Sequence, residues 1–118
     1  MYLGKGTMMD KINVFEQTYR LLKDLSVVDT KAEFCKTWLG RNEGYFRGLR
    51  YKNKQPSTQT FAVLSNKLRH YSNLLQQTNN THSKKIAAQF ASLSNQCDKY
   101  INRKAKDTWL RLMDTSND

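Results

Sequence analysis

The chain has 118 residues, which is enough for one compact domain with a modest core. No apolar run approaches the roughly 18 residues that a membrane-spanning helix needs, and the N-terminus has no apolar signal core. We therefore expect an intracellular protein that does not enter a membrane. The two cysteines, Cys35 and Cys97, lie on apolar faces of predicted helices, which favours buried reduced thiols over a disulfide.

The net charge of +10 is concentrated in one part of the chain. Residues 41–75 carry seven basic side chains and one acidic side chain. Residues 1–40 carry six basic and five acidic, and residues 76–118 carry seven basic and four acidic. More than half of the excess charge therefore lies in the middle segment. This distribution is expected where a protein contacts phosphate groups; the alternative is a basic surface that only aids solubility.

The first helix is expected over residues 9–25, after a segment at residues 1–8 that has no hydrophobic periodicity and is expected to be mobile. Apolar residues in the helix recur at steps of three and four, so they form one stripe. The residues of this stripe are Ile12, Phe15, Tyr19 and Leu22. We expect this stripe to pack across the next two helices.

Two short helices are predicted over residues 31–39 and 43–51, with Gly40 between them. Thr30 and Glu33 have the spacing of a capping box, in which each side chain accepts a free backbone amide at the start of the helix. Glycine adopts the left-handed conformation that ends a helix and turns the chain. Two short helices around a tight glycine turn form a helix-turn-helix.

A fourth helix is expected from Ser57 or Thr58 to Leu75, because Pro56 ends the basic loop before it. After a polar loop, the last helix is predicted over residues 83–113, capped by Thr81 or Ser83. The predicted fold class is all-α: a four-helix head containing a helix-turn-helix (residues 9–75), followed by a long C-terminal amphipathic helix (residues 81–114).

The last helix has apolar residues at alternating steps of three and four, as in a coiled coil. About thirty residues give a rod of about 45 Å, which is longer than the head needs to cover itself. We therefore predict that this helix forms a homodimer contact; the alternative is that it wraps the head. The dimer-interface candidates are Ile86, Phe90, Leu93, Cys97 and Ile101.

The segment from about residue 30 to residue 68 resembles the helix-turn-helix of the phage-repressor and Cro class of DNA-binding domains. In that class apolar residues lie five positions and one position before the turn glycine, and six and nine positions after it. Here these positions hold Cys35, Leu39, Phe46 and Leu49. A basic loop, a Pro-Ser pair and an amphipathic helix often follow, and residues 52–68 read KNKQPSTQTFAVLSNKL.

This chain departs from the class pattern at four positions. Lys36 replaces a small alanine, and Arg41 replaces an apolar residue just after the turn. Gly44 and Gly48 weaken the second helix by up to about 1 kcal/mol each. These departures affect the crossing of the two helices and their register.

The resemblance implies sequence-specific binding of double-stranded DNA by a homodimeric, repressor-like regulator on an inverted-repeat operator, with the second helix in the major groove. Such a protein is expected in a bacterial or phage-like cytoplasm, associated with the nucleoid when bound. Arginine recognises guanine, asparagine adenine and glutamate cytosine. The base-contact candidates are Asn42, Glu43, Gly44 and Arg47. The phosphate-contact candidates are Lys31, Arg41, Tyr45, Arg50, Lys52, Lys54 and Ser57.

Several of these residues have other interpretations. Asn42 can serve only as a helix cap, and Glu43 can serve only to complement the positive N-terminus of the helix. Gly44 and Gly48 allow close backbone approach either to DNA or to another protein element. Trp38 and Tyr51 are expected in core or hinge packing rather than as stacking platforms for bases.

Two other function classes fit the same sequence. The helix-turn-helix can act as a scaffold whose basic face docks an acidic partner protein, or the same face can bind RNA. Catalysis is not expected, because the chain has no paired carboxylates in an apolar setting and no His-Cys-Asp arrangement. With two histidines and no CxxC motif, neither a zinc site nor another cofactor is expected.

Overall fold

The apolar stripes of the sequence become helices in the computed structural model, which describes residues 3–116 and the side chains of residues 14–114. Within these residues the chain contains helices and no strand, as predicted. None of the described helices is long and apolar enough to cross a membrane. The helices are α1 (Leu3–Asp24), α2 (Lys31–Trp38), α3 (Tyr45–Lys52), α4 (Thr58–Gln76) and α5 (Thr81–Ser116).

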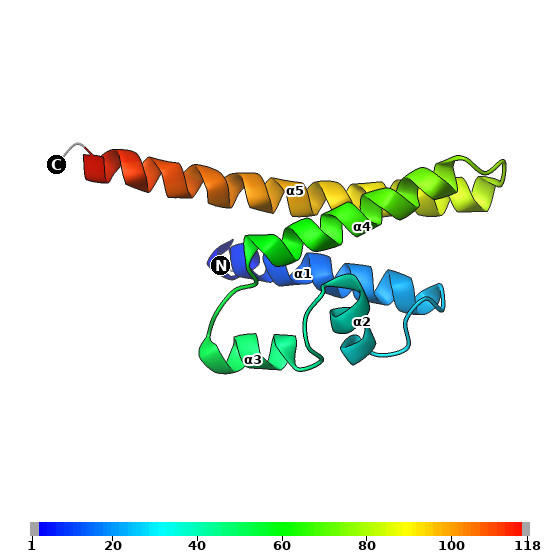
Figure 1. Ribbon diagram of the computed structural model, residues 1–118, viewed down its shortest axis with the longest axis horizontal. Coiled ribbons are helices and arrows are strands. Elements are labelled where there is room, and N and C mark those ends of the chain that lie inside the picture. The colour runs from blue at the N-terminus through cyan, green and yellow to red at the C-terminus, as the bar shows by residue number, and fades with distance from the viewer. Residues whose placement is uncertain (1–2, 117–118) are drawn as a thin grey trace.

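Helices α4 and α5 form an antiparallel pair along the length of the molecule, which measures 58 × 32 × 30 Å (Figure 1). Helix α1 lies beside this pair, and the short helix α2 also contacts α4 directly (Figure 1). The 36 residues of α5 correspond to a rod of about 54 Å, so this one helix sets the long axis. Its C-terminal end projects beyond the other helices (Figure 1).

Side-chain caps begin three of the helices. Thr30 Oγ1 accepts the Glu33 amide at 3.1 Å, and Glu33 Oε1 accepts the Asp29 amide at 2.8 Å. The predicted capping box is therefore present, except that Glu33 accepts the amide of Asp29 instead of the amide of Thr30. Ser57 caps α4, as predicted. For α5 the prediction of Thr81 or Ser83 was wrong, because Asn80 Oδ1 accepts the amides of residues 82 and 83.

An aromatic cluster ties the helices together. Phe15 of α1 has its ring centroid 5.5 Å from that of Phe46 on α3 and 4.7 Å from that of Phe61 on α4. Phe61 continues to Tyr100 of α5 at 3.9 Å. These contacts carry the core from α3 to α5, so the short helices and the long pair share one hydrophobic interior.

Small polar residues bring α4 and α5 close together. Ser65 and Ser94 are buried, and their hydroxyl oxygens are 2.8 Å apart. Ser65 Oγ also donates to Asp98 Oδ1 at 2.6 Å, while Arg69 forms an ion pair with the same carboxylate. Buried hydroxyls stabilise a helix contact only when they are paired, as these are. The pair of helices is thus held by a specific polar contact as well as by apolar packing.

The predicted dimer contact on α5 was wrong at the residue level. Phe90, Leu93 and Cys97 are buried against the rest of the same chain, and Ile86 and Ile101 are partly buried against the same core. A heptad-like stripe specifies an apolar face and not the identity of its partner, and here the partner is α4. Burial raises the pKa of the Cys97 thiol to about 12, with the Asp98 charge adding to the shift. Both cysteines are buried and free, as predicted.

Two helix starts also differ from the sequence prediction. Helix α1 begins at Leu3 instead of Met9, so most of the segment expected to be irregular is helical. The stripe residue Ile12 lies outside the residues whose side chains are described. Helix α3 begins at Tyr45 instead of Glu43, because the chain needs two more residues to complete the turn.

Replacement of one leucine on α5 tests whether its apolar stripe serves the fold. Leu93 is 6% exposed, so we expect Leu93→Ala to lower the free energy of unfolding by about 2–5 kcal/mol in chemical denaturation. The matched control is Gln96→Ala on the same helix, where Gln96 is exposed and the change should stay within about 0.5 kcal/mol. Normal stability with a halved mass in sedimentation would instead place Leu93 between subunits.

Candidate nucleic-acid interface

The connection between α2 and α3 is built on one left-handed glycine. Gly40 has φ +67°, the conformation that the sequence predicted for it. The Arg41 amide then donates to the Cys35 carbonyl at 2.9 Å, which closes the end of α2. Asn42 Oδ1 accepts the Gly44 amide at 3.0 Å and so holds the rest of the turn. The prediction that Asn42 is the N-cap of the second helix was wrong: its side chain holds the turn, and the N-cap of α3 is Gly44, which has no side-chain cap bond.

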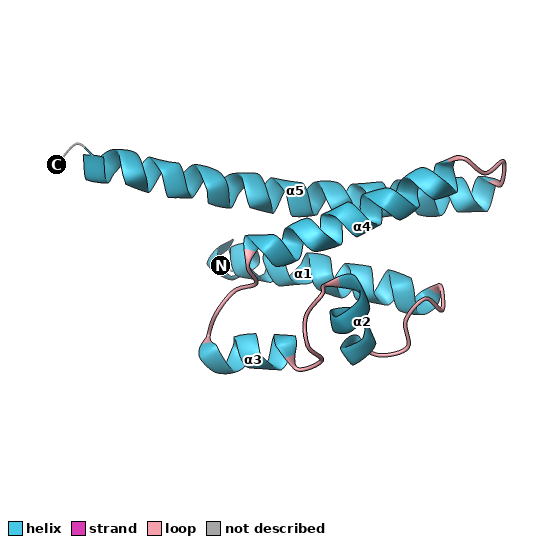
Figure 2. Cartoon of the chain, in the orientation of Figure 1, coloured by secondary structure: helices cyan, strands magenta, loops and turns pink. Residues whose placement is uncertain are grey.

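Helix α3 is attached to the domain by one face. None of its residues is fully buried, but Phe46 and Leu49 are half-buried, and Phe46 packs against Phe15 and Phe34. On the α2 side, burial raises the pKa of the Cys35 thiol, and a hydrogen bond from the Phe46 amide partly offsets this effect. The opposite face of α3 lies at the edge of the molecule, away from α4 and α5 (Figure 2).

A cluster of hydrogen bonds fixes α3 to the start of α4. At its centre is Thr60 Oγ1, in a fully buried side chain. This atom lies 3.0 Å from each of three groups: Arg41 Nε, the Tyr45 hydroxyl and the Ser57 hydroxyl. Arg41 Nη2 also donates to Ser57 Oγ at 3.0 Å, and the guanidinium lies 5.3 Å from the Tyr45 ring centroid. The turn, the first residue of α3 and the cap of α4 therefore meet at one residue.

This cluster divides the seven predicted phosphate contacts into two groups. Arg41, Tyr45 and Ser57 are engaged inside the domain, and for Arg41 and Tyr45 this is a structural role that the sequence prediction did not include. Lys31 is engaged as well, because its Nζ lies 3.0 Å from Glu16 Oε1 and above the Tyr19 ring. The remaining predicted phosphate contacts are Arg50, Lys52 and Lys54, all exposed.

Four cations without acidic neighbours lie along α3 and the residues that follow it. These exposed side chains are Arg47, Arg50, Lys52 and Lys54. Within the side chains of residues 14–114, no carboxylate oxygen lies within 4.0 Å of any of them. The nearby acid, Glu43, is 68% exposed, and its closest cation is Lys36 of α2 at 4.0 Å. Unpaired charges of one sign on an exposed helix attract phosphate groups.

The two glycines of this region are not required by packing inside the chain. A Cβ atom at Gly48 would meet no atom within 4 Å, and one at Gly44 would make ordinary contacts with Arg47 and Asn42. Neither glycine has a positive φ. Among the described residues, close approach to another element of the same chain therefore does not explain Gly48.

The two aromatic residues of the segment have opposite environments. Trp38 is buried, as predicted, and its ring packs against Phe90 and Tyr71. The prediction for Tyr51 was wrong, because this side chain is 91% exposed between Arg50 and Lys52. The spacing contains the signal: residue 51 is two positions after Leu49 and so lies off the face that Phe46 and Leu49 share. Sequence reasoning therefore missed an aromatic side chain on the basic face.

Among the described residues, no group of three or more His, Cys, Asp or Glu side chains is placed to hold a metal ion. The chain belongs to the family of unknown function DUF6626, whose model matches residues 15–110. No curated protein and no solved structure matches the chain significantly. The matched residues include the C-terminal part of α1, both short helices, α4 and most of α5.

The Thr60 cluster is tested by an isosteric replacement. Thr60→Val removes the oxygen that three groups share, so we expect the free energy of unfolding to fall by about 1–3 kcal/mol in chemical denaturation. Thr58→Val is the matched control, because Thr58 is exposed at the first position of α4, and its effect should stay within about 0.5 kcal/mol. Equal effects of the two substitutions would show that the cluster contributes nothing specific.

Proposed function

We propose that this chain binds double-stranded DNA with α3 in the major groove and acts as a homodimeric, repressor-like regulator. The observation that carries the proposal is the row of unpaired cations on and after α3, Arg47, Arg50, Lys52 and Lys54, on a helix that is attached to the domain by its opposite face. A major groove is about as wide as one helix, so a helix fixed in this way can enter it.

Within the proposal the side chains have different roles. Arg47 lies in the first turn of α3 and is exposed, so it is the leading base contact, with guanine as its preferred base. Arg50, Lys52 and Lys54 neutralise phosphates, which gives affinity without sequence choice. Gly48 lets the backbone of α3 come close to the DNA, which accounts for a half-buried helical glycine with open space at its Cβ position.

The homodimer belongs to the same proposal, because an inverted-repeat operator requires two-fold symmetry. Since the predicted interface residues of α5 are used inside the monomer, the contact is assigned to the projecting end of this helix. Trp109, Leu110, Leu112 and Met113 expose 42–62% of their surface there. The proposed location is the cytoplasm, with nucleoid association when the protein is bound.

Selection from randomised duplex DNA tests the whole proposal. Purified protein is incubated with the duplex pool at about 150 mM salt, and bound molecules are sequenced after several rounds. We expect enrichment of an inverted repeat with half-sites about one helical turn apart, as two linked copies of α3 require. Enrichment of a single half-site would contradict the dimer. No enrichment, with weak binding lost in salt, would contradict sequence-specific recognition.

Substitution of Arg47 tests its assignment on the enriched sequence. We expect Arg47→Ala to weaken specific binding by about 1–3 kcal/mol and to relax the preference at one base pair, as measured by fluorescence anisotropy. The charge-matched control is Lys84→Ala, because Lys84 is exposed in the first turn of α5, and this end of α5 lies far from α3 (Figure 1). An effect on binding to an acidic protein or to RNA, with DNA binding unchanged, would favour one of those alternatives.

Gly48 gives a test in which stability and binding move in opposite directions. Because its Cβ position is open, Gly48→Ala should raise the free energy of unfolding by up to about 1 kcal/mol. On DNA the added methyl group would press against the duplex, and we expect binding to weaken by about 1–3 kcal/mol. Binding that is unchanged or tighter would mean that the α3 backbone does not approach the DNA closely.

A further inference from the structure

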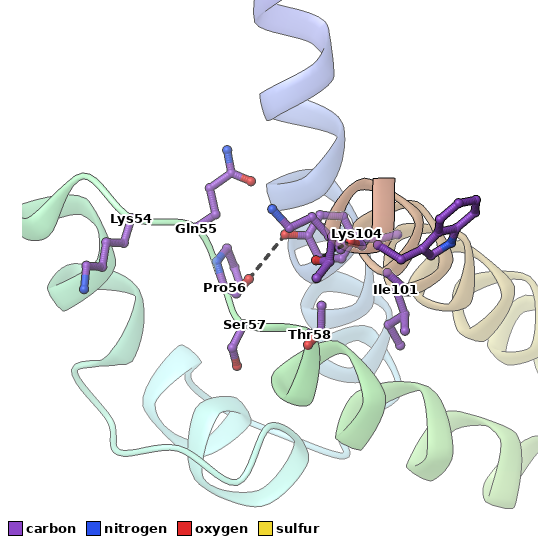
Figure 3. A pocket seen from close by; sticks show the side chains of 11 residues that line it. Lys54, Gln55, Pro56, Ser57, Thr58, Ile101 and Lys104 are labelled. Atoms are coloured by element: carbon purple, nitrogen blue, oxygen red, sulfur yellow. Dashed lines mark hydrogen bonds between the residues drawn. The ribbon is translucent and has the colours of Figure 1, made fainter. Parts of the chain in front are cut away.

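A groove of about 830 Å³ lies beside the basic end of α3, and its α5 wall lies outside the segment that resembles a helix-turn-helix. Its walls are the loop after α3, the start of α4 and the projecting part of α5 (Figure 3). The Tyr100 hydroxyl donates to the Pro56 carbonyl at 3.4 Å, so the loop is fastened to α5 at the floor of the groove (Figure 3). Pro56 and Tyr100 are buried, which makes this wall a fixed part of the fold.

The groove has the chemistry of an anion site. Lys54 of the loop and Lys104 of α5 both line the groove, and Figure 3 shows the Lys54 side chain pointing away from Lys104. Thr58 also lines the groove, and the lining contains no acidic residue. The Ser57 hydroxyl is engaged with Arg41 and Thr60. Within the side chains of residues 14–114, no carboxylate oxygen lies within 4.0 Å of either lysine. Lys104 is half-buried, so its stem is held against the protein.

The groove is continuous with the basic face of α3. Lys52 is the last residue of α3, and Lys54 follows two positions later and lines the groove. A DNA strand that leaves the major groove along the end of α3 would therefore meet Lys54 and then Lys104.

We propose that this groove binds the phosphate backbone of the DNA strand that flanks α3, with Lys104 as a phosphate contact supplied by α5. This inference rests on the proposed DNA binding and deepens it, because it adds an element outside the helix-turn-helix to the interface. Phosphate contacts position a protein on the duplex and are insensitive to base sequence. Each one also adds about 0.9 to the slope of log affinity against log salt.

The test compares two lysines on the same helix. Lys104→Ala removes the groove lysine, and Lys106→Ala removes an exposed lysine that does not line the groove. Dissociation constants are measured from 50 to 200 mM salt on the selected duplex and on a scrambled duplex. We expect the slope of log affinity against log salt to be smaller by about 0.9 for Lys104→Ala. The fourfold rise in salt should therefore lower the DNA affinity of the unsubstituted protein about 3.5-fold more than that of the variant. Lys106→Ala should keep the original slope.

The outcomes separate this inference from the proposed function. A normal slope for Lys104→Ala, with Arg47→Ala still impaired, would overturn the groove assignment and leave DNA binding in place. Normal DNA binding by both Lys104→Ala and Arg47→Ala would overturn the groove assignment and the placement of α3 in the major groove. Lys104→Gln, which keeps a similar stem, should reproduce the Lys104→Ala slope, and equal unfolding midpoints exclude a folding defect. If inorganic phosphate at constant ionic strength binds the unsubstituted protein but not Lys104→Ala, while the two proteins have equal salt slopes on DNA, the groove is a site for free anions and the assignment to DNA is wrong.

Discussion

The position of Phe15 determines how the two halves of the molecule are joined. Its ring lies between Phe46 of α3 and Phe61 of α4, with centroid distances of 5.5 and 4.7 Å. Helix α3 has no fully buried residue of its own, so its orientation depends on this stack and on the hydrogen bonds at Thr60. Aromatic pairs in such tilted arrangements add about 0.5–1.5 kcal/mol each beyond simple burial. A helix held along one face in this way keeps its opposite face available for a ligand.

Most of the fold could be predicted from the sequence, because local signals decide it. The three- and four-residue spacing of apolar residues identified every helix, and Thr30, Ser57 and Gly40 mark helix ends through their own hydrogen bonds or backbone angle. Boundaries were less certain where two local effects compete. Asn42 caps the turn through the Gly44 amide instead of starting a helix, which delays α3 to Tyr45.

The candidate site could be predicted only in part, because burial and partners depend on distant residues. Sequence reasoning places Arg41 with the surface cations, yet its guanidinium bonds to Thr60, nineteen positions away. The stripe through Leu93 is equally consistent with a second chain or with α4, and only the folded structure distinguishes them. Lys104 was overlooked for the same reason: nothing near it in the sequence indicates that it lines a groove together with the loop after α3.

The two tryptophans give the molecule a built-in spectroscopic contrast. Trp38 is enclosed by the aromatic rings of the core, whereas Trp109 is 49% exposed and lines the groove. Indole emission shifts to longer wavelength in water, so the native fluorescence is the sum of a blue component from the core and a red component from the groove. Iodide reaches only the exposed ring. The quenchable part of the emission therefore reports on the groove, while the remainder reports on whether the core is folded.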